Sequence, residues 1–178
     1  MLKRDIFLTM LLSTLAVLPG SKVEAADVNI TGNVTAAACT VSPALTGGQT
    51  VDLGTLGRTK FQHTGDTGNW KSFALNLTNC PSGTTKSTVT FTGTADGTDG
   101  TLFANTETAA TAAPNIAIQM AKDTDHSAIL SNSSTMTVDI DSLTSTATFP
   151  LAARLYTPSG GVQAGQVSSS VLVNFTYQ

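Results

Sequence analysis

The chain has 178 residues and a formal net charge of −3, with 12% charged and 6% aromatic residues. The charged fraction is about half that of a typical globular protein, while threonine (31), serine (16) and glycine (15) are abundant. This composition is typical of a secreted β-protein and not of a helical cytosolic enzyme. A nucleic-acid-binding protein needs a cluster of basic residues, and the sequence has none. That class of function is therefore excluded.

Residues 1–25 are predicted to be a signal peptide. Lys3 and Arg4 precede an uncharged, mainly apolar run at 6–18. This run suits the centre of an export signal and is too short to cross a bilayer as a helix. Cleavage after Ala25 is expected, which would leave a mature chain outside the cytoplasm that is not inserted in the membrane. The alternative is an N-terminal helix buried in the fold.

Apolar side chains recur at every second position along the mature chain, which is the period of a strand with one buried face. The strands predicted from this pattern have the following residues on one face, in chain order: Val28, Ile30, Gly32 and Val34; Val51 and Leu53, in a short strand; Phe73, Leu75 and Leu77; Val89 and Phe91; Ile116, Ile118 and Met120; Met136, Val138 and Ile140; Phe149, Leu151, Ala153 and Leu155; Val171, Val173, Phe175 and Tyr177. Clusters of Gly, Asp, Asn and Pro between these runs predict turns. No mature segment has the period of a helix.

These strands and turns favour one all-β domain, an antiparallel sandwich of the immunoglobulin type. The first strand is separated from the others by residues 35–38, as an arm would be. Cys39 and Cys80 are the only cysteines, and no CxxC motif is present. Because an exported chain meets oxidising conditions, we predict a structural disulfide between them. On the chain-entropy model it stabilises the fold by about 3–4 kcal/mol.

The sequence offers little that would support catalysis. Asp66-Thr67-Gly68 is the tripeptide that carries the catalytic aspartate of aspartic proteases, but that chemistry needs two such carboxylates. The sequence has no second copy, so a glycine-flanked turn is the simpler interpretation. His126 with Asp123 and Asp125 is a weak candidate for a metal site, and a polar turn is the preferred interpretation of these residues. We expect no enzyme, no cofactor and no metal.

Two further features have both a structural and a functional interpretation. Asp96 and Asp99 lie among glycines, as calcium ligands often do, but the ligand pattern of an EF-hand is missing. Trp70 is the only tryptophan. It is either an aromatic residue of the core or its rim, or a platform on which a sugar ring stacks.

Several segments resemble, in their order and spacing, those of subunits of chaperone–usher pili, specifically the type 1 fimbrial class. The resemblance is strongest to the minor adaptor subunits of the pilus tip and extends over the whole chain. The segments that carry it are ADVNITGNV at 26–34, CTV at 39–41, VDLG at 51–54, LNLTNCP at 75–81, FTGTAD at 91–96, FPL at 149–151 and FTYQ at 175–178.

The resemblance implies an incomplete immunoglobulin-like sandwich that lacks its last strand and is completed by a donor strand from a neighbouring subunit. Residues 26–38 would be the N-terminal donor-strand extension, and residues 39–178 the pilin domain. The side chains inserted into the neighbour would be those of Val28, Ile30, Gly32 and Val34. The groove edge, which a periplasmic chaperone would contact first, would be formed by Val171, Val173, Phe175, Tyr177 and Gln178.

From this resemblance we expect a structural fimbrial subunit, exported through the periplasm to fimbriae on the cell surface, that supports cell adhesion and biofilm formation. Its expected partners are other pilin subunits, a periplasmic chaperone and an outer-membrane usher, at which the donor strand of the next subunit replaces the chaperone. The alternative is a sugar-binding adhesin at the fimbrial tip. It is less favoured because such adhesins usually carry an additional lectin domain.

Overall fold

The computed structural model describes residues 31–32 and 38–178. The chain divides into two units after Val34, and the fold presented below is that of the second unit. Thr31 and Gly32 are exposed and belong to no helix or strand. The predicted signal peptide and the rest of the predicted first strand lie outside the described residues.

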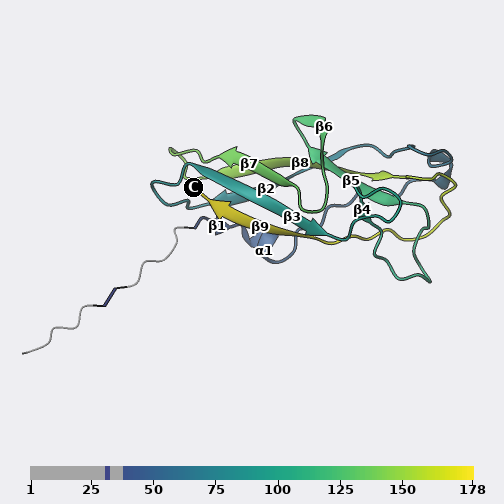
Figure 1. The fold of residues 1–178 in the computed structure, drawn as a ribbon, viewed down its shortest axis with the longest axis horizontal. Helices are drawn as coiled ribbons and strands as arrows, with labels where there is room; N and C mark the ends of the chain where they lie inside the picture. Colours follow the sequence, from purple (N-terminus) through teal and green to yellow (C-terminus); the bar gives the residue numbers. More distant parts are fainter. Residues whose placement is uncertain (1–30, 33–37) are drawn as a thin grey trace, which may run out of the picture. The chain divides into compact units, whose positions relative to one another are not determined.

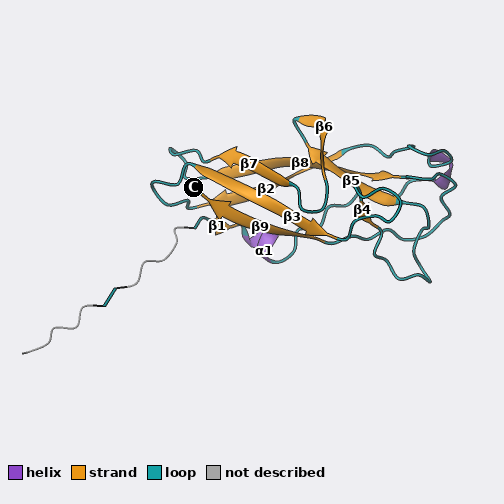
Figure 2. Ribbon diagram, in the orientation of Figure 1, coloured by secondary structure: helices purple, strands orange, loops and turns teal. Residues whose placement is uncertain are grey.

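Nearly all of the regular secondary structure in the described part of the chain is β-strand, joined by long loops (Figures 1 and 2). The strands are β1 (Thr40–Val41), β2 (Lys71–Thr78), β3 (Lys86–Gly93), β4 (Phe103–Ala104), β5 (Ala117–Lys122), β6 (Asp125–Leu130), β7 (Thr135–Asp139), β8 (Ala147–Tyr156) and β9 (Val171–Tyr177). A four-residue helix α1 (Pro43–Thr46) and a short 3-10 helix η1 (Arg58–Lys60) follow β1.

The strands form two antiparallel sheets. One has the order β1-β2-β8-β5-β4, with β6 also paired to β5, and the other has the order β7-β3-β9. The register between β2 and β8 places Phe73 opposite Leu151, and that between β3 and β9 places Phe91 opposite Val173. Because side chains alternate between the two faces of a strand, these registers collect the predicted apolar side chains on one face of each sheet, and the two faces pack on each other in the core.

The main core lies between the two sheets. Its largest fully buried side chains include Phe91, Phe149, Leu77 and Leu151. A second, smaller cluster forms around Phe61, with Ala113, Ile116, Leu155 and Val162. The predicted all-β sandwich is therefore confirmed, and the strands predicted around Leu75, Val89, Phe149 and Phe175 are present as β2, β3, β8 and β9.

Three local predictions differ from the structure. Val51 and Leu53 are not in a strand, because Asp52 Oδ1 accepts the Gly54 N–H at 2.8 Å and closes a turn there. Asp125 and His126 begin strand β6, where a polar turn was expected, since the turn is confined to the two residues before them. Helix α1 was not predicted, and it begins at Pro43, which suits a first helical position.

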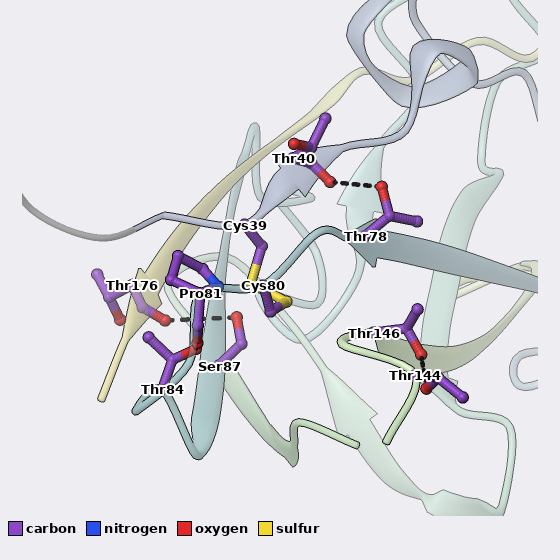
Figure 3. The surroundings of a disulfide bond; sticks show 10 residues. All are labelled: Cys39, Thr40, Thr78, Cys80, Pro81, Thr84, Ser87, Thr144, Thr146 and Thr176. Carbon is purple, nitrogen blue, oxygen red and sulfur yellow. Dashed lines mark hydrogen bonds between the residues drawn. A yellow bond between two sulfur atoms is a disulfide. The ribbon is translucent and has the colours of Figure 1, made fainter. Parts of the chain in front are cut away.

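The predicted disulfide between Cys39 and Cys80 is present, and both residues are buried. It joins the start of β1 to the segment that follows β2, beside the pair Thr40 and Thr78 (Figure 3). The bridge therefore fastens the short strand β1, which has only two ladder residues, to the edge of the larger sheet. No helix in the described ranges is long and apolar enough to cross a membrane.

Candidate functional site: an open groove beside the last strand

Strand β9 lies at the edge of the smaller sheet, and its inward side chains are only half-buried. The burial alternates along the strand, with Val171, Val173, Phe175 and Tyr177 partly buried and the residues between them exposed. On the neighbouring strand β3, by contrast, the inward Val89 and Phe91 are almost fully buried. The apolar face of β9 is thus incompletely covered by the described residues.

The main-chain groups of β9 are also incompletely paired within the described structure. Lys86 and Gln178 exchange both of their N–H···O bonds, at 3.0 and 3.1 Å. Because paired residues alternate in an antiparallel ladder, it is the even-numbered residues of β9 that bond to β3. The odd-numbered residues, whose side chains face inward, therefore direct their N–H and C=O groups away from β3, toward the open edge.

This edge continues toward the N-terminal side of β9. The Gln166 N–H donates to the Thr111 carbonyl at 2.7 Å, and the Ser168 carbonyl accepts from the Thr106 N–H at 2.7 Å. These even-numbered residues are again bonded on the side away from the groove. Val167 and Ser169, which alternate with them, are half-buried. This extension was not predicted from the sequence, because a serine-rich run is typical of a loop.

A large groove runs along this edge, with a volume of about 1430 Å³. Its floor is formed by apolar side chains from both sheets, among them Phe73, Leu75, Phe91, Met120, Leu151, Ala153 and Leu155. Val167, Ser169, Val171, Val173 and Phe175 line one side, whereas Tyr177 and Gln178 are not among the lining residues. The roles predicted for Tyr177 and Gln178 at the end of the groove edge stay predictions.

The segment 48–57 also lines the groove. Among the described residues, positions 49–56 make no main-chain to main-chain hydrogen bond. The side chains of Val51, Leu53 and Leu56 are nevertheless half-buried. The groove is thus bordered by β9 and by a second segment that also has free main-chain groups in this part of the structure, so a strand placed between them would find partners on both sides.

Two polar features mark the C-terminal end of β9. The Gln178 main-chain oxygen accepts hydrogen bonds from the N–H groups of Thr85 and Lys86. Burial raises the pKa of the Tyr177 phenol above its ordinary value. The hydrogen bonds to Thr85 and Lys86 hold this end of β9 against the start of β3.

The residues considered for catalysis have structural roles in this fold. Asp66 Oδ2 accepts the His63 N–H at 2.8 Å, which closes the turn that contains the Asp-Thr-Gly tripeptide. Asp96 Oδ1 likewise accepts from the N–H groups of Thr98 and Asp99. Across residues 38–178 no group of three His, Cys, Asp or Glu side chains is close enough to hold a metal ion.

Trp70 lies at the outer surface of the larger sheet. Its ring stacks on His126, with ring centroids 4.5 Å apart, and the guanidinium carbon of Arg154 lies 4.3 Å from the centroid. Arg154 also donates to Gln119 Oε1 at 2.8 Å, and burial lowers the pKa of its guanidinium. The tryptophan is therefore already used in contacts within the chain, outside the groove.

Comparisons with known proteins show which proteins are similar to the chain that forms this groove. The profile of the family described as "Fimbrial protein" matches residues 28–178. Protein FimG of Escherichia coli (strain K12) is 36% identical over 168 residues, which is 93% of this chain and 94% of that protein.

Solved structures agree on the fold. The P pilus rod subunit PapA superposes with a TM-score of 0.63 over 79% of this chain and 99% of its own, at 17% identity. A subunit in the structure of a chaperone–usher pilus superposes with a TM-score of 0.62 over 90% of this chain and 100% of its own, at 18% identity.

Proposed function

Because the chain belongs to the fimbrial protein family, we propose that its groove accepts a β-strand from a neighbouring subunit, and that the chain is a non-catalytic structural subunit of a pilus. The observation that carries the proposal is the edge formed by β9. At the same positions, such as Val171 and Val173, it offers half-buried apolar side chains and unpaired main-chain groups.

The physical basis is the addition of a strand to a sheet edge. Main-chain hydrogen bonds to the odd-numbered residues of β9 would supply affinity, and alternate side chains that enter the groove would supply specificity. The added strand would cover an apolar edge that would otherwise be prone to aggregation. A groove of about 1430 Å³ with a largely apolar floor has room for several large side chains, as this mode of binding requires.

Assembly partners follow from the same proposal. A periplasmic chaperone would cover the groove until an outer-membrane usher brings in the strand of the next subunit, so the chain would be exported through the periplasm to the cell surface. The donor strand that this chain supplies to its own neighbour would come from residues 26–38. The assembled pilus would support cell adhesion and biofilm formation.

The groove assignment is tested by placing a charge inside it. Val173→Lys should bury an unpaired charge beneath the incoming strand and abolish incorporation into pili. Asn174→Lys is the matched control, since Asn174 lies on the outer face of the same strand. Pilus incorporation is measured by immunoelectron microscopy, and resistance of the periplasmic subunit to protease reports folding. Equal incorporation of both variants would refute the proposal.

A further inference from the structure

We propose that Leu143 is the centre of a docking surface, outside the groove, for the fimbrial subunit that receives residues 26–34 of this chain. The surface lies on the loop that joins β7 to β8. The contact would fix the orientation of the two subunits, in addition to the inserted strand that holds them together. This inference rests on the proposed function and adds to it a surface of the donating subunit.

Leu143 is the most exposed large apolar side chain in residues 38–178. Its exposed fraction is 95%, and Leu172, at 63%, is the only other large apolar side chain that is exposed in these residues. Single exposed leucines are common on protein surfaces and do not by themselves mark a site. What distinguishes Leu143 is the construction and the position of its loop.

The loop that carries Leu143 is held in one conformation. Asp141 Oδ1 accepts the N–H groups of Leu143 and Thr144, at 2.8 and 3.3 Å. Asp141 and Thr146 also exchange both of their main-chain hydrogen bonds. The hydroxyl groups of Thr144 and Thr146 lie 2.8 Å apart (Figure 3). An ordered turn therefore holds the leucine out in solvent, so little conformational entropy is lost when a partner covers it.

The main chain on both sides of the loop's anchor is strained. Ser145 has a φ of 54° and Asn79 a φ of 50°, in the left-handed region that residues other than glycine rarely adopt. Such conformations persist only where surrounding contacts enforce them, and they are frequent at functional sites. Here the Cys80 N–H donates to the Ser145 carbonyl at 2.9 Å. This bond fastens the loop to the segment that carries the disulfide.

The loop lies at the end of the domain from which the chain leads to its donor segment. Cys80, whose N–H bonds to this loop, is joined to Cys39 by the disulfide. Figure 1 shows the β7–β8 loop at the same end of the domain as the start of β1. Only residues 35–38 separate Cys39 from the segment 26–34, and a stretch of that length spans about 14 Å at most. A subunit that holds this segment must therefore lie against the end that bears Leu143.

A shallow hollow beside the loop completes the docking surface. Its volume is about 180 Å³, and its lining includes Pro81, Gly83, Thr84, Ile140 and Ser142. Because Ser142 directly precedes Leu143, the raised leucine and the hollow are adjacent. A partner at this end can cover the leucine and place one side chain of its own in the hollow. A raised and a hollowed element together restrict how the partner is oriented.

The small size of this surface identifies its occupant. A stable interface buries about 1,200–2,000 Å² in total, far more than one leucine and one small hollow supply. The surface therefore needs a partner that is already held nearby. The subunit that has received residues 26–34 is such a partner, because the inserted strand keeps it at a high effective concentration.

The contact is tested by photo-crosslinking in pili that the full-length chain has entered. Benzoylphenylalanine is incorporated at position 31, 143 or 124 in separate strains, and the purified pili are irradiated. Thr31 alternates with the inserted side chains, so position 31 marks the receiving subunit. Thr124 is an exposed control in the turn between β5 and β6. Mass spectrometry then identifies the cross-linked peptides.

We expect positions 31 and 143 to cross-link to the same subunit, and position 124 to give no cross-link to it. If position 143 captures nothing, or a different protein, while position 31 captures the receiving subunit, the docking surface is wrong and the proposed function stands. A cross-link from position 143 to residues 141–146 of a second copy would mean that two such loops meet, and would also overturn the proposal. If position 31 captures no fimbrial subunit, the proposed function fails as well.

A displacement experiment measures how much the contact contributes. Pili are incubated with an excess of a synthetic peptide of residues 26–36, which has the donor segment without the domain, and release of the subunit is followed. Leu143→Ser should be released about tenfold faster than the wild type, because a buried leucine no longer adds to the inserted strand.

Leu172→Ser is the matched control, since it removes the other exposed leucine, on the outer face of β9. It should be released at the wild-type rate. The chaperone complex of Leu143→Ser should melt at the wild-type temperature, because an exposed side chain adds little to the fold. Release of Leu143→Ser at the wild-type rate would refute the docking surface.

Discussion

Phe149 and Phe175 meet across the two sheets, with ring centroids 5.5 Å apart and ring planes tilted by 50°. Phe149 on β8 is fully buried, whereas Phe175 on β9 remains half-buried and lines the groove. One ring of this pair is thus part of a finished core, and the other borders the groove. The tilted geometry is one that aromatic pairs prefer.

The two rings should therefore respond differently to truncation. Phe149→Ala should lower the free energy of unfolding by about 3–5 kcal/mol, as is usual for a buried phenylalanine, and Phe175→Ala by about 1–2 kcal/mol, since part of its area is already exposed. Filling the groove with the peptide of residues 26–36 should raise the second loss toward the first. Thr176→Ala, on the outer face, is the control. Equal losses in the empty groove would contradict this assignment.

The disulfide is expected to contribute to the stability of the sheet edge. Cys39 and Cys80 are 41 residues apart, and a closed loop of that length stabilises the fold by about 4 kcal/mol on the chain-entropy model. The double variant Cys39→Ser with Cys80→Ser should lose about this amount in chemical denaturation. Wild-type protein reduced before unfolding should lose the same amount. Detection of free thiols in the oxidised protein would disprove the bridge.

Gly165 is predicted to be intolerant of any side chain. A Cβ there would lie 2.6 Å from the carbonyl carbon of Ala112 and 2.7 Å from the Cα of Ala113, and main chain cannot yield as a flexible side chain would. Gly165→Ala should cost about 1–3 kcal/mol and disturb the groove edge next to it. Gly97→Ala, where a Cβ meets no atom within 4 Å, should change stability by less than about 0.5 kcal/mol. Thermal unfolding of the two variants decides the point.

The sequence predicted the strands whose burial alternates, because one face of β2, β8 or β9 packs on the core and the other does not. It missed β6, since Asp125 and His126 are exposed and main-chain pairing with β5, not burial, holds this part of the strand. The prediction that the sandwich is incomplete came from a family resemblance, because no pattern within one chain shows that a strand is supplied by another subunit. Ser169 was missed because its inward position depends on hydrogen bonds made by its neighbours, such as Ser168.

The contact between Trp70 and Arg154 should show as a coupling free energy. Double-mutant cycles with Trp70→Leu and Arg154→Met are expected to give about 0.5–1 kcal/mol, with little dependence on salt. The exposed ion pair of Lys86 and Asp139, at 2.8 Å, is the comparison, and its coupling should fall as ionic strength rises. Because Arg154 lies on the outer face of β8, strand insertion into the groove should be unchanged. If a substitution of Arg154 blocked strand insertion, the outer face of β8 would not be independent of the groove.

The raised pKa of Tyr177 makes a prediction at high pH. Burial favours the neutral phenol in the folded protein, so its pKa lies above the value of about 10 that it has in the unfolded chain. The folded state then holds its proton more tightly than the unfolded state. The contribution of this phenol to the free energy of unfolding is fully present below a pH of about 10, and it is lost as the pH rises through the pKa of the folded state.

Tyr177→Phe removes the titrating group and should therefore lose less stability between pH 8 and pH 11 than the wild type, where these values bracket the ordinary tyrosine pKa of about 10. The measurement is the free energy of unfolding at both pH values for the two proteins. Other groups that titrate in this range are shared, so they cancel in the comparison. Because Tyr177 does not line the groove, the difference should be the same whether the groove is empty or filled by the peptide. A difference that grows on filling would place Tyr177 beneath the inserted strand.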